Sequence, residues 1–155
     1  MILFLSFLLV VTGDQLSKNI WVRSYREGQT IYELGFFRLA HIQNTGVAFG
    51  MFQGQSSALT IAAGVGIVVL VGLAFVIYRR FPFLVSLPNT VAFSLILGGT
   101  VGNLIDRLRL DHVTDFIDVG VWPAFNVADS AIVVGVVIVA YSLIRLAVAE
   151  RHGSA

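Results

Sequence analysis

Long uncharged runs separated by short polar segments predict four membrane-spanning helices. The clearest run extends from Ala58 to Tyr78 without a charge and ends at Arg79 and Arg80. A helix rises about 1.5 Å per residue, so roughly 20 residues cross a hydrocarbon core of about 30 Å. On this basis we expect helices over about residues 2–22, 58–78, 83–106 and 127–147.

Residues 23–57 follow a different pattern, rich in aromatic and β-branched residues. Phe37, Leu39 and His41 alternate with their neighbours in the way that is typical of a strand. We therefore expect a small β-sheet over about residues 28–50, at the membrane surface between helices 1 and 2. With no internal repeat or low-complexity linker, the prediction is one domain over residues 1–155, a membrane all-α bundle of four transmembrane helices with that β-sheet segment.

The first apolar run has an alternative interpretation as a cleaved signal peptide. It lacks the basic residues that precede the apolar part of a signal peptide, and no small-x-small cleavage pattern follows it. The transmembrane interpretation is therefore favoured.

Four spans place the polar residues on one side of the membrane. The end of the first span, the β segment, the end of the third span and the start of the fourth all share that side. Eight of the nine acids, all but Glu150, lie there. The polar residues that converge are Asp14, Lys18, Asn44, Asn103, Asp106, Arg107, Asp115, Asn126 and Asp129. The pattern predicts a polar site at one mouth of the bundle.

The composition narrows the function. The chain is 57% hydrophobic and 12% charged, whereas soluble domains carry about 25% charged residues; its mean hydropathy is +0.87. A net charge of +1 argues against a nucleic-acid partner. Without cysteine there is no disulfide or thiolate chemistry, and the three histidines are too scattered for a metal site. We expect neither a metal nor a cofactor, which leaves the carboxylates.

Asp115 and Asp129 are the candidate catalytic pair. A carboxylate at membrane depth is costly and marks a functional position. Two carboxylates close together share one proton, so that the charged one activates a water while the protonated one donates to a scissile carbonyl. Asp129 begins the fourth helix, whose N-terminus favours a negative charge, whereas apolar neighbours raise the pKa of Asp115. Asp129 is therefore predicted to be the more ionised partner.

Five motifs on the acidic side resemble those of the bacterial lipoprotein signal peptidase family (signal peptidase II), and the resemblance covers essentially the whole chain. They are Asp14-Gln-Leu-Ser-Lys18, Asn44-Thr-Gly-Val-Ala-Phe49, Gly98-Gly-Thr-Val-Gly-Asn-Leu-Ile-Asp-Arg107, Val113-Thr-Asp-Phe116 and Phe125-Asn-Val-Ala-Asp129. The resemblance implies an aspartic endopeptidase that cleaves the signal peptide of diacylglyceryl-modified prolipoproteins just before the lipidated cysteine.

The same resemblance assigns residues and a location. Asp115 and Asp129 match the family's catalytic aspartates. The implied substrate-binding or supporting residues are Asp14, Lys18, Asn44, Gly46, Asn103, Asp106, Arg107, Asn126 and Ala128. The implied setting is the bacterial cytoplasmic membrane, with both termini cytoplasmic and the site near the outer face. The expected partners are lipid-modified prolipoproteins and membrane lipid, and we expect a monomer.

Charge alone leaves the orientation open. Six Lys and Arg residues lie on the acidic side and four on the other. Taken literally, the positive-inside rule therefore opposes the implied orientation. If Lys18 and Arg107 are held inside the site, the count becomes four against four.

Each acidic residue also has a structural interpretation. Asp129 could serve only as a helix N-cap, although Asn126 is placed to cap at less cost. Asp115 could be an exposed loop acid, which is the interpretation we favour for Asp111 and Asp118. Asp106 competes for the catalytic role, but its position beside an arginine favours a part in the supporting polar network.

The supporting residues have structural alternatives as well. Asn103 and Asn126 either orient the aspartates or join helices by hydrogen bonds. Asp14 and Lys18, four residues apart, either form a plain ion pair on one helix face or support the site. For the small residues Gly98, Gly99 and Gly102, close helix packing is favoured over clearance for a substrate.

Two other functional classes remain in competition. A proton-coupled transporter would carry charges near the midplane and repeat symmetry between its halves, and neither is present in the apolar runs of spans two and three. A non-enzymatic assembly factor would tolerate hydrophobic replacements of its polar residues.

Overall fold

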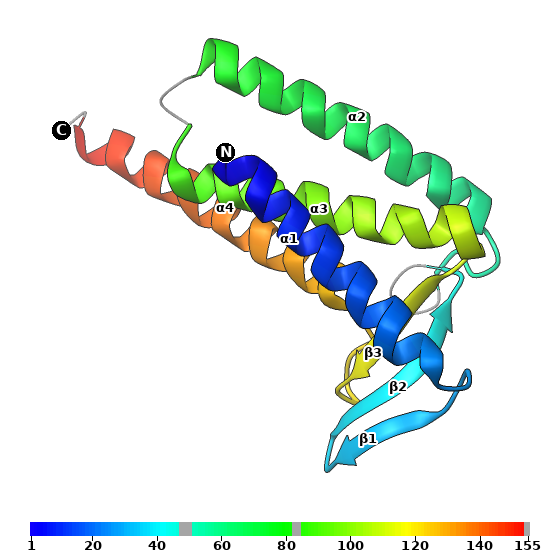
Figure 1. The fold of residues 1–155 in the computed structure, drawn as a ribbon. Coiled ribbons are helices and arrows are strands. Elements are labelled where there is room, and N and C mark those ends of the chain that lie inside the picture. Colours follow the sequence, from blue (N-terminus) through cyan, green and yellow to red (C-terminus); the bar gives the residue numbers. More distant parts are fainter. Residues whose placement is uncertain (47–50, 82–84, 154–155) are drawn as a thin grey trace.

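Four α-helices lie alongside one another, and a small sheet closes one end of the bundle (Figure 1). The computed structural model describes residues 1–46, 51–81 and 85–153. The helices of this part are α1 (Ile2–Leu16), α2 (Ser56–Arg80), α3 (Leu87–Leu110) and α4 (Val127–Gly153). Both termini lie at the end away from the sheet (Figure 1).

The first predicted helix is present but changes its winding. After α1 the chain makes a π-helical turn, Ser17–Trp21, and then a 3-10 turn, Val22–Ser24. The α-helical part, α1, has only 15 residues. Three of the described helices are long and apolar enough to cross a membrane, and they are α2, α3 and α4 up to Ala149. The π turn rotates Lys18 to a fully buried position, and such turns are frequent at functional sites.

The third helix starts later than predicted. We expected it from residue 83, whereas α3 begins at Leu87, and residues 82–84 lie outside the described part of the chain. The Ser86 side chain caps the helix by accepting a hydrogen bond from the Asn89 backbone N–H, and Pro88 occupies the first turn. Proline is tolerated there because first-turn N–H groups have no partner inside the helix.

Glycines bring the helices into close contact. A Cβ atom added at Gly99 would lie 2.3 Å from the carbonyl oxygen of Ala128 in α4, and one at Gly98 would lie 2.9 Å from the Cβ of Val10 in α1. Any larger residue would force the backbones apart. Helix packing is therefore confirmed as a role of these small residues.

The sheet has three antiparallel strands in the order β1 (Thr30–Leu34), β2 (Phe37–Asn44) and β3 (Val113–Asp118). The β segment predicted over about residues 28–50, between helices 1 and 2, is confirmed as the β1–β2 hairpin, although residues 47–50 lie outside the described ranges. The third strand, β3, follows α3 and was not predicted. Asp111 ends α3 in the left-handed conformation, with φ 61°, and the chain then pairs with β2.

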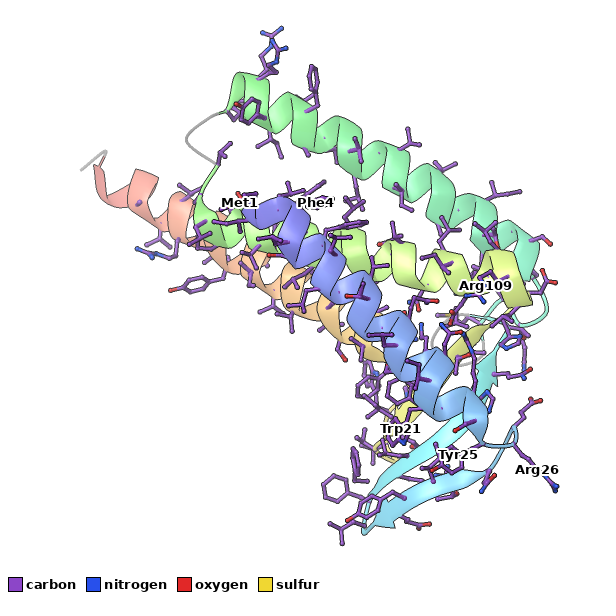
Figure 2. All side chains as sticks on the ribbon, in the orientation of Figure 1. Met1, Phe4, Trp21, Tyr25, Arg26 and Arg109 are labelled. Atoms are coloured by element: carbon purple, nitrogen blue, oxygen red, sulfur yellow. The ribbon has the colours of Figure 1, made fainter. Side chains whose placement is uncertain are left out.

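Most of the largest fully buried side chains are polar, and the charged ones lie at the sheet end. Lys18, Asn126, Asp14 and Asp106 are among the largest fully buried ones, whereas α2 buries none of its residues and presents apolar side chains all round. A helix of that kind is typical of a lipid environment. Trp21 and Tyr25 lie where α1 runs into the sheet, and Met1 and Phe4 lie at the opposite end (Figure 2).

Candidate active site

Asn126 joins the two candidate catalytic carboxylates. Its side-chain amide donates to Oδ1 of Asp115 at 2.7 Å, and its backbone N–H donates to Oδ2 of Asp129 at 3.2 Å. Asp115 is carried by β3 and Asp129 by the first turn of α4. The two acids predicted from the sequence are thus brought to one place by a strand and a helix.

Asn126, and not Asp129, caps α4. The Asn126 Oδ1 atom accepts a hydrogen bond from the Asp129 backbone N–H at 2.9 Å, while the Asp129 carboxylate returns the bond to the Asn126 N–H. This reciprocal pair is a capping box. The interpretation of Asp129 as the N-cap is therefore wrong, and its Oδ1 atom also accepts from the Asn103 amide at 2.8 Å.

Asp115 is buried, with 2% of its surface exposed, so the exposed-loop interpretation of this acid is wrong. The Asn44 side-chain amide donates to its Oδ2 atom at 2.9 Å. Burial, followed by the negative charge of Asp129, raises the pKa of Asp115 to about 7, against the opposing effect of the Asn44 and Asn126 donors. Asp115 therefore holds a proton in the range where a general acid is needed.

A buried ionic cluster lies beside the two aspartates. Lys18, with no exposed surface, contacts Oδ2 of Asp14 at 2.8 Å, Oδ2 of Asp106 at 3.1 Å and Oδ1 of Asn103 at 3.1 Å. The plain ion pair between Asp14 and Lys18 is present, and it is part of a larger network. Asn103 connects this network to Asp129, so the asparagine both joins helices and contacts a candidate catalytic acid.

Asp14 and Asp106 each accept a backbone hydrogen bond from the residue that precedes a candidate catalytic aspartate. Asp14 Oδ1 accepts the backbone N–H of Ala128 at 3.0 Å, and Asp106 Oδ2 accepts the backbone N–H of Thr114 at 3.1 Å. Lys18 links the two acids. One lysine therefore bridges the backbone anchors of both aspartates, which places Ala128 in the supporting structure.

Sequence reasoning missed two members of this network. The Arg23 guanidinium contacts Oδ1 of Asp106 at 2.7 Å and donates to the Thr114 hydroxyl at 3.0 Å. Gln15 donates to both Asp14 and Asp106, at 3.2 and 3.1 Å. The sequence gives no local signal for them, because adjacent residues such as Asp14 and Gln15, or residues five apart such as Lys18 and Arg23, do not share a face of a regular α-helix.

A cleft opens beside Asp115. Its volume is about 160 Å³, and it lies between the end of β2, including Asn44, and the segment at Pro123 and Ala124. Gly46 lies two residues beyond Asn44, and Arg107 donates to the Gly46 carbonyl oxygen at 3.3 Å. The Asn44 Oδ1 atom accepts from the Gly46 N–H at 2.9 Å, which fixes the turn at the cleft edge.

The other acids of the segment lie away from this network. Asp111 is exposed at the end of α3, as expected. The exposed-loop interpretation is wrong for Asp118, which lies on β3, is only partly exposed and forms an ion pair with Arg38 across the sheet. The backbone N–H of Gly120, followed by the Arg38 contact, lowers the pKa of Asp118. Within the described ranges, no group of three or more His, Cys, Asp or Glu side chains is arranged to hold a metal ion.

Comparison with known proteins gives one consistent result. The family model described as signal peptidase (SPase) II matches residues 6–145. The lipoprotein signal peptidase of Dehalococcoides mccartyi is 46% identical over 154 residues, covering 99% of this chain and 93% of the relative. That of Moorella thermoacetica is 39% identical over 143 residues, covering 88% and 89%. A solved bacterial membrane enzyme superposes with a TM-score of 0.80 at 28% identity, covering 92% of this chain and 87% of the other.

Proposed function

The chain belongs to the signal peptidase II family, and we propose that it cleaves the signal peptide of diacylglyceryl-modified prolipoproteins just before the lipidated cysteine, by an aspartic mechanism. The observation that carries the mechanism is Asn126, which donates to Asp115 and Asp129 at once. A pair held in this way shares a proton and titrates as a unit.

In the proposed reaction, Asp129 is the ionised partner, because it lies in the first turn of α4 and accepts two N–H donors. It takes a proton from a water as that water attacks the scissile carbonyl carbon. Asp115, protonated, gives its proton to the carbonyl oxygen. In the second half of the reaction the proton on Asp129 passes to the leaving amine, the C–N bond breaks, and Asp115 recovers its own.

The cleft beside Asp115 is the proposed peptide site. Asn44 lines it on the sheet side and fixes the turn at Gly46, so an extended peptide lying there meets backbone and amide groups suited to hold it. The β1–β2 hairpin is proposed to clamp the peptide from above. If a variant with the hairpin turn at Gly35 and Phe36 stiffened or shortened cleaved as fast as wild type, the clamp would be wrong.

We propose that α1 with its π and 3-10 turns forms a fourth span, that both termini are cytoplasmic, and that the monomer is active with its site near the outer face. The absence of cysteine in the sequence makes this testable. Single cysteines at exposed Glu33 and at Arg80 should react with a membrane-impermeant thiol reagent in intact cells only at position 33. Labelling at position 80 alone would show that the protein has the opposite orientation.

The reaction is tested with purified protein and a diacylglyceryl-modified prolipoprotein peptide in the presence of EDTA. Wild type should cleave it, Asp115→Asn and Asp129→Asn should lose activity, and Asp106→Asn should remain folded with weakened activity. Asp118→Asn is the matched control, since it lies on the same strand but outside the network. If Asp106→Asn were as inactive as the first two, the choice of catalytic pair would have to be reopened.

A further inference from the structure

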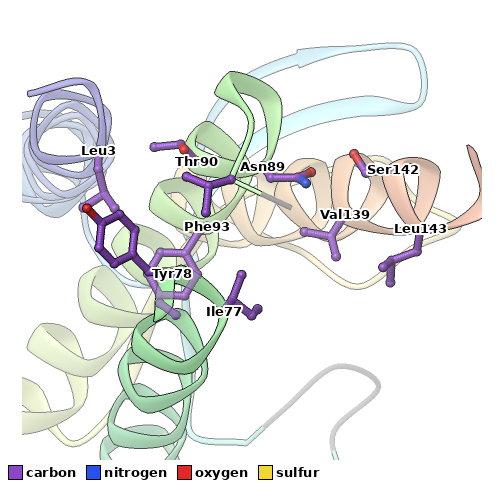
Figure 3. A pocket seen from close by; sticks show the side chains of 11 residues that line it. Leu3, Ile77, Tyr78, Asn89, Thr90, Phe93, Val139, Ser142 and Leu143 are labelled. Carbon is purple, nitrogen blue, oxygen red and sulfur yellow. The ribbon is translucent and has the colours of Figure 1, made fainter. Parts of the chain in front are cut away.

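Two adjoining cavities lie at the end of the bundle opposite the sheet. The first has a volume of about 210 Å³, and its lining is drawn from all four helices, mostly from apolar side chains. Figure 3 shows Leu3, Tyr78 and Phe93, which come from three helices, gathered on one side, with Leu143 of α4 across from them. A cavity of this lining is suited to hydrocarbon.

The second cavity continues the first toward a positive charge. It has a volume of about 680 Å³, shares Asn89 and Ser142 with the first, and reaches Tyr141 and Arg145 of α4. The two together form a path that runs from apolar side chains, past an amide and a hydroxyl, to a guanidinium.

The charge distribution decides which occupant fits this path. Arg79 and Arg80 end α2 at the same end of the bundle, and eight of the chain's nine acids, all but Glu150, belong to the opposite end. This end therefore attracts an anion. A signal peptide carries its positive charges just before its apolar segment, so the same arginines disfavour that basic part of a substrate.

We propose that these two cavities hold one anionic phospholipid, with an acyl chain in the apolar cavity and the phosphate at Arg145. The planar guanidinium presents paired N–H donors that match phosphate oxygens. Basic pockets between transmembrane helices bind anionic headgroups in this manner. Asn89 and Ser142 lie between the two parts, at the level of the polar glycerol esters.

The bound lipid would also have a structural role. No residue of α2 is buried, and Ala74, Ile77 and Tyr78 of this helix face the first cavity. An acyl chain there would fill the space between α2 and the other helices. Binding of the lipid should therefore raise the temperature at which the protein unfolds.

The test uses purified full-length protein in detergent, titrated with phosphatidylglycerol or with phosphatidylcholine of the same acyl chains, and bound lipid is counted by native mass spectrometry. Wild type should retain phosphatidylglycerol preferentially. Arg145→Gln should weaken its binding roughly fivefold, as expected from about one arginine at a lipid headgroup. Arg109→Gln, which removes an exposed arginine from the sheet end, is the matched control and should leave the preference unchanged.

A second pair of variants tests the acyl-chain cavity without altering charge. Ala74→Phe fills the first cavity and should reduce the binding of both lipids, whereas Val68→Phe, exposed on the outer face of the same helix, should not. Equal retention of the two lipids by wild type, or equal effects of Arg145→Gln and Arg109→Gln, would overturn the proposal. Displacement of the lipid by a signal-peptide segment, one for one, would instead assign the cavities to the substrate.

Discussion

Lys18 offers the sharpest test of how this site is held together. It is the only lysine of the chain, it has no exposed surface, and it lies 2.8 Å from one carboxylate oxygen and 3.1 Å from another. Lys18→Met keeps most of the side-chain length and removes the charge. Asp14 and Asp106 then remain buried with only Arg23 to balance them.

The expected loss follows from that imbalance. Removing one partner of a buried ion pair costs about 3–5 kcal/mol, because the other charge is left uncompensated. Here two carboxylates lose the same ammonium, so Lys18→Met should lower the free energy of unfolding by an amount at the upper end of that range. Lys18→Arg should not restore it, because a longer, planar group has to enter a fully buried position.

The assay is denaturant unfolding in detergent micelles, followed by tryptophan fluorescence. Trp21 is a suitable reporter because its ring packs edge-on against Phe116 of β3, with 6.2 Å between the ring centroids. The double variant Asp14→Asn with Lys18→Met restores charge balance, since Asp106 then faces Arg23 alone. It should be more stable than Lys18→Met. If the double variant lost the sum of the two single losses, the charge-balance reasoning would be refuted.

Three further predictions follow from the geometry. Because the pKa of Asp115 is raised to about 7, its protonated form stabilises the folded state at low pH, and this contribution is lost as pH rises from about 4 through 7. The free energy of unfolding should therefore fall more steeply over that range for wild type than for Asp115→Asn. Parallel curves for the two proteins would contradict this. Gly99→Ala should lower the stability of the folded protein by about 1–3 kcal/mol, because the added methyl group forces α3 away from α4. Gly66→Ala, in open space on α2, should leave the stability unchanged. Thermal unfolding of the two variants measures the difference. Arg23→Gln should lower kcat by about tenfold to a hundredfold with little change in KM. Arg26→Gln, at an exposed arginine, should change neither constant. A rise in KM alone in Arg23→Gln would show that Arg23 does not position the proposed catalytic pair.

The helices were predictable because their signal is local. An uncharged run predicts a membrane helix from hydropathy alone, and the runs at 58–78 and 127–147 lie within α2 and α4. The first helix was harder, because its α-helical part ends at Leu16 and the π turn that follows has no local sequence signal. Within that turn Lys18 contacts Asp106, a residue far along the chain.

Strand β3 was missed for a related reason. Its six residues, Val113–Asp118, include two aspartates and no clear alternation, so the segment has the pattern of a polar loop. It is a strand because β2 supplies its hydrogen-bonding partners, with Ile42 opposite Asp115. Strand propensity is decided largely by such neighbours, which a single sequence does not display.

Most members of the site's polar network were predictable from the sequence, Gln15 and Arg23 excepted, but the connections between them were not. The sequence predicted that Asp14, Lys18 and Asp106 would lie on the same side of the membrane as the catalytic pair. It did not predict that Asp14 and Asp106 each accept the backbone N–H of the residue just before a candidate catalytic aspartate. Those bonds depend on the meeting of α1, α3, β3 and α4.

This arrangement explains why so costly a cluster is retained beside the site. Asp14 and Asp106 balance Lys18 and Arg23, so the cluster adds no net charge to the region around Asp115 and Asp129. A buried ion pair contributes little net stability compared with apolar packing of the same volume. Its use here is geometric, since hydrogen bonds to charged groups are short and directional. The cluster thereby fixes the start of α4 relative to β3, and so the separation of the two carboxylates that we propose act on one water.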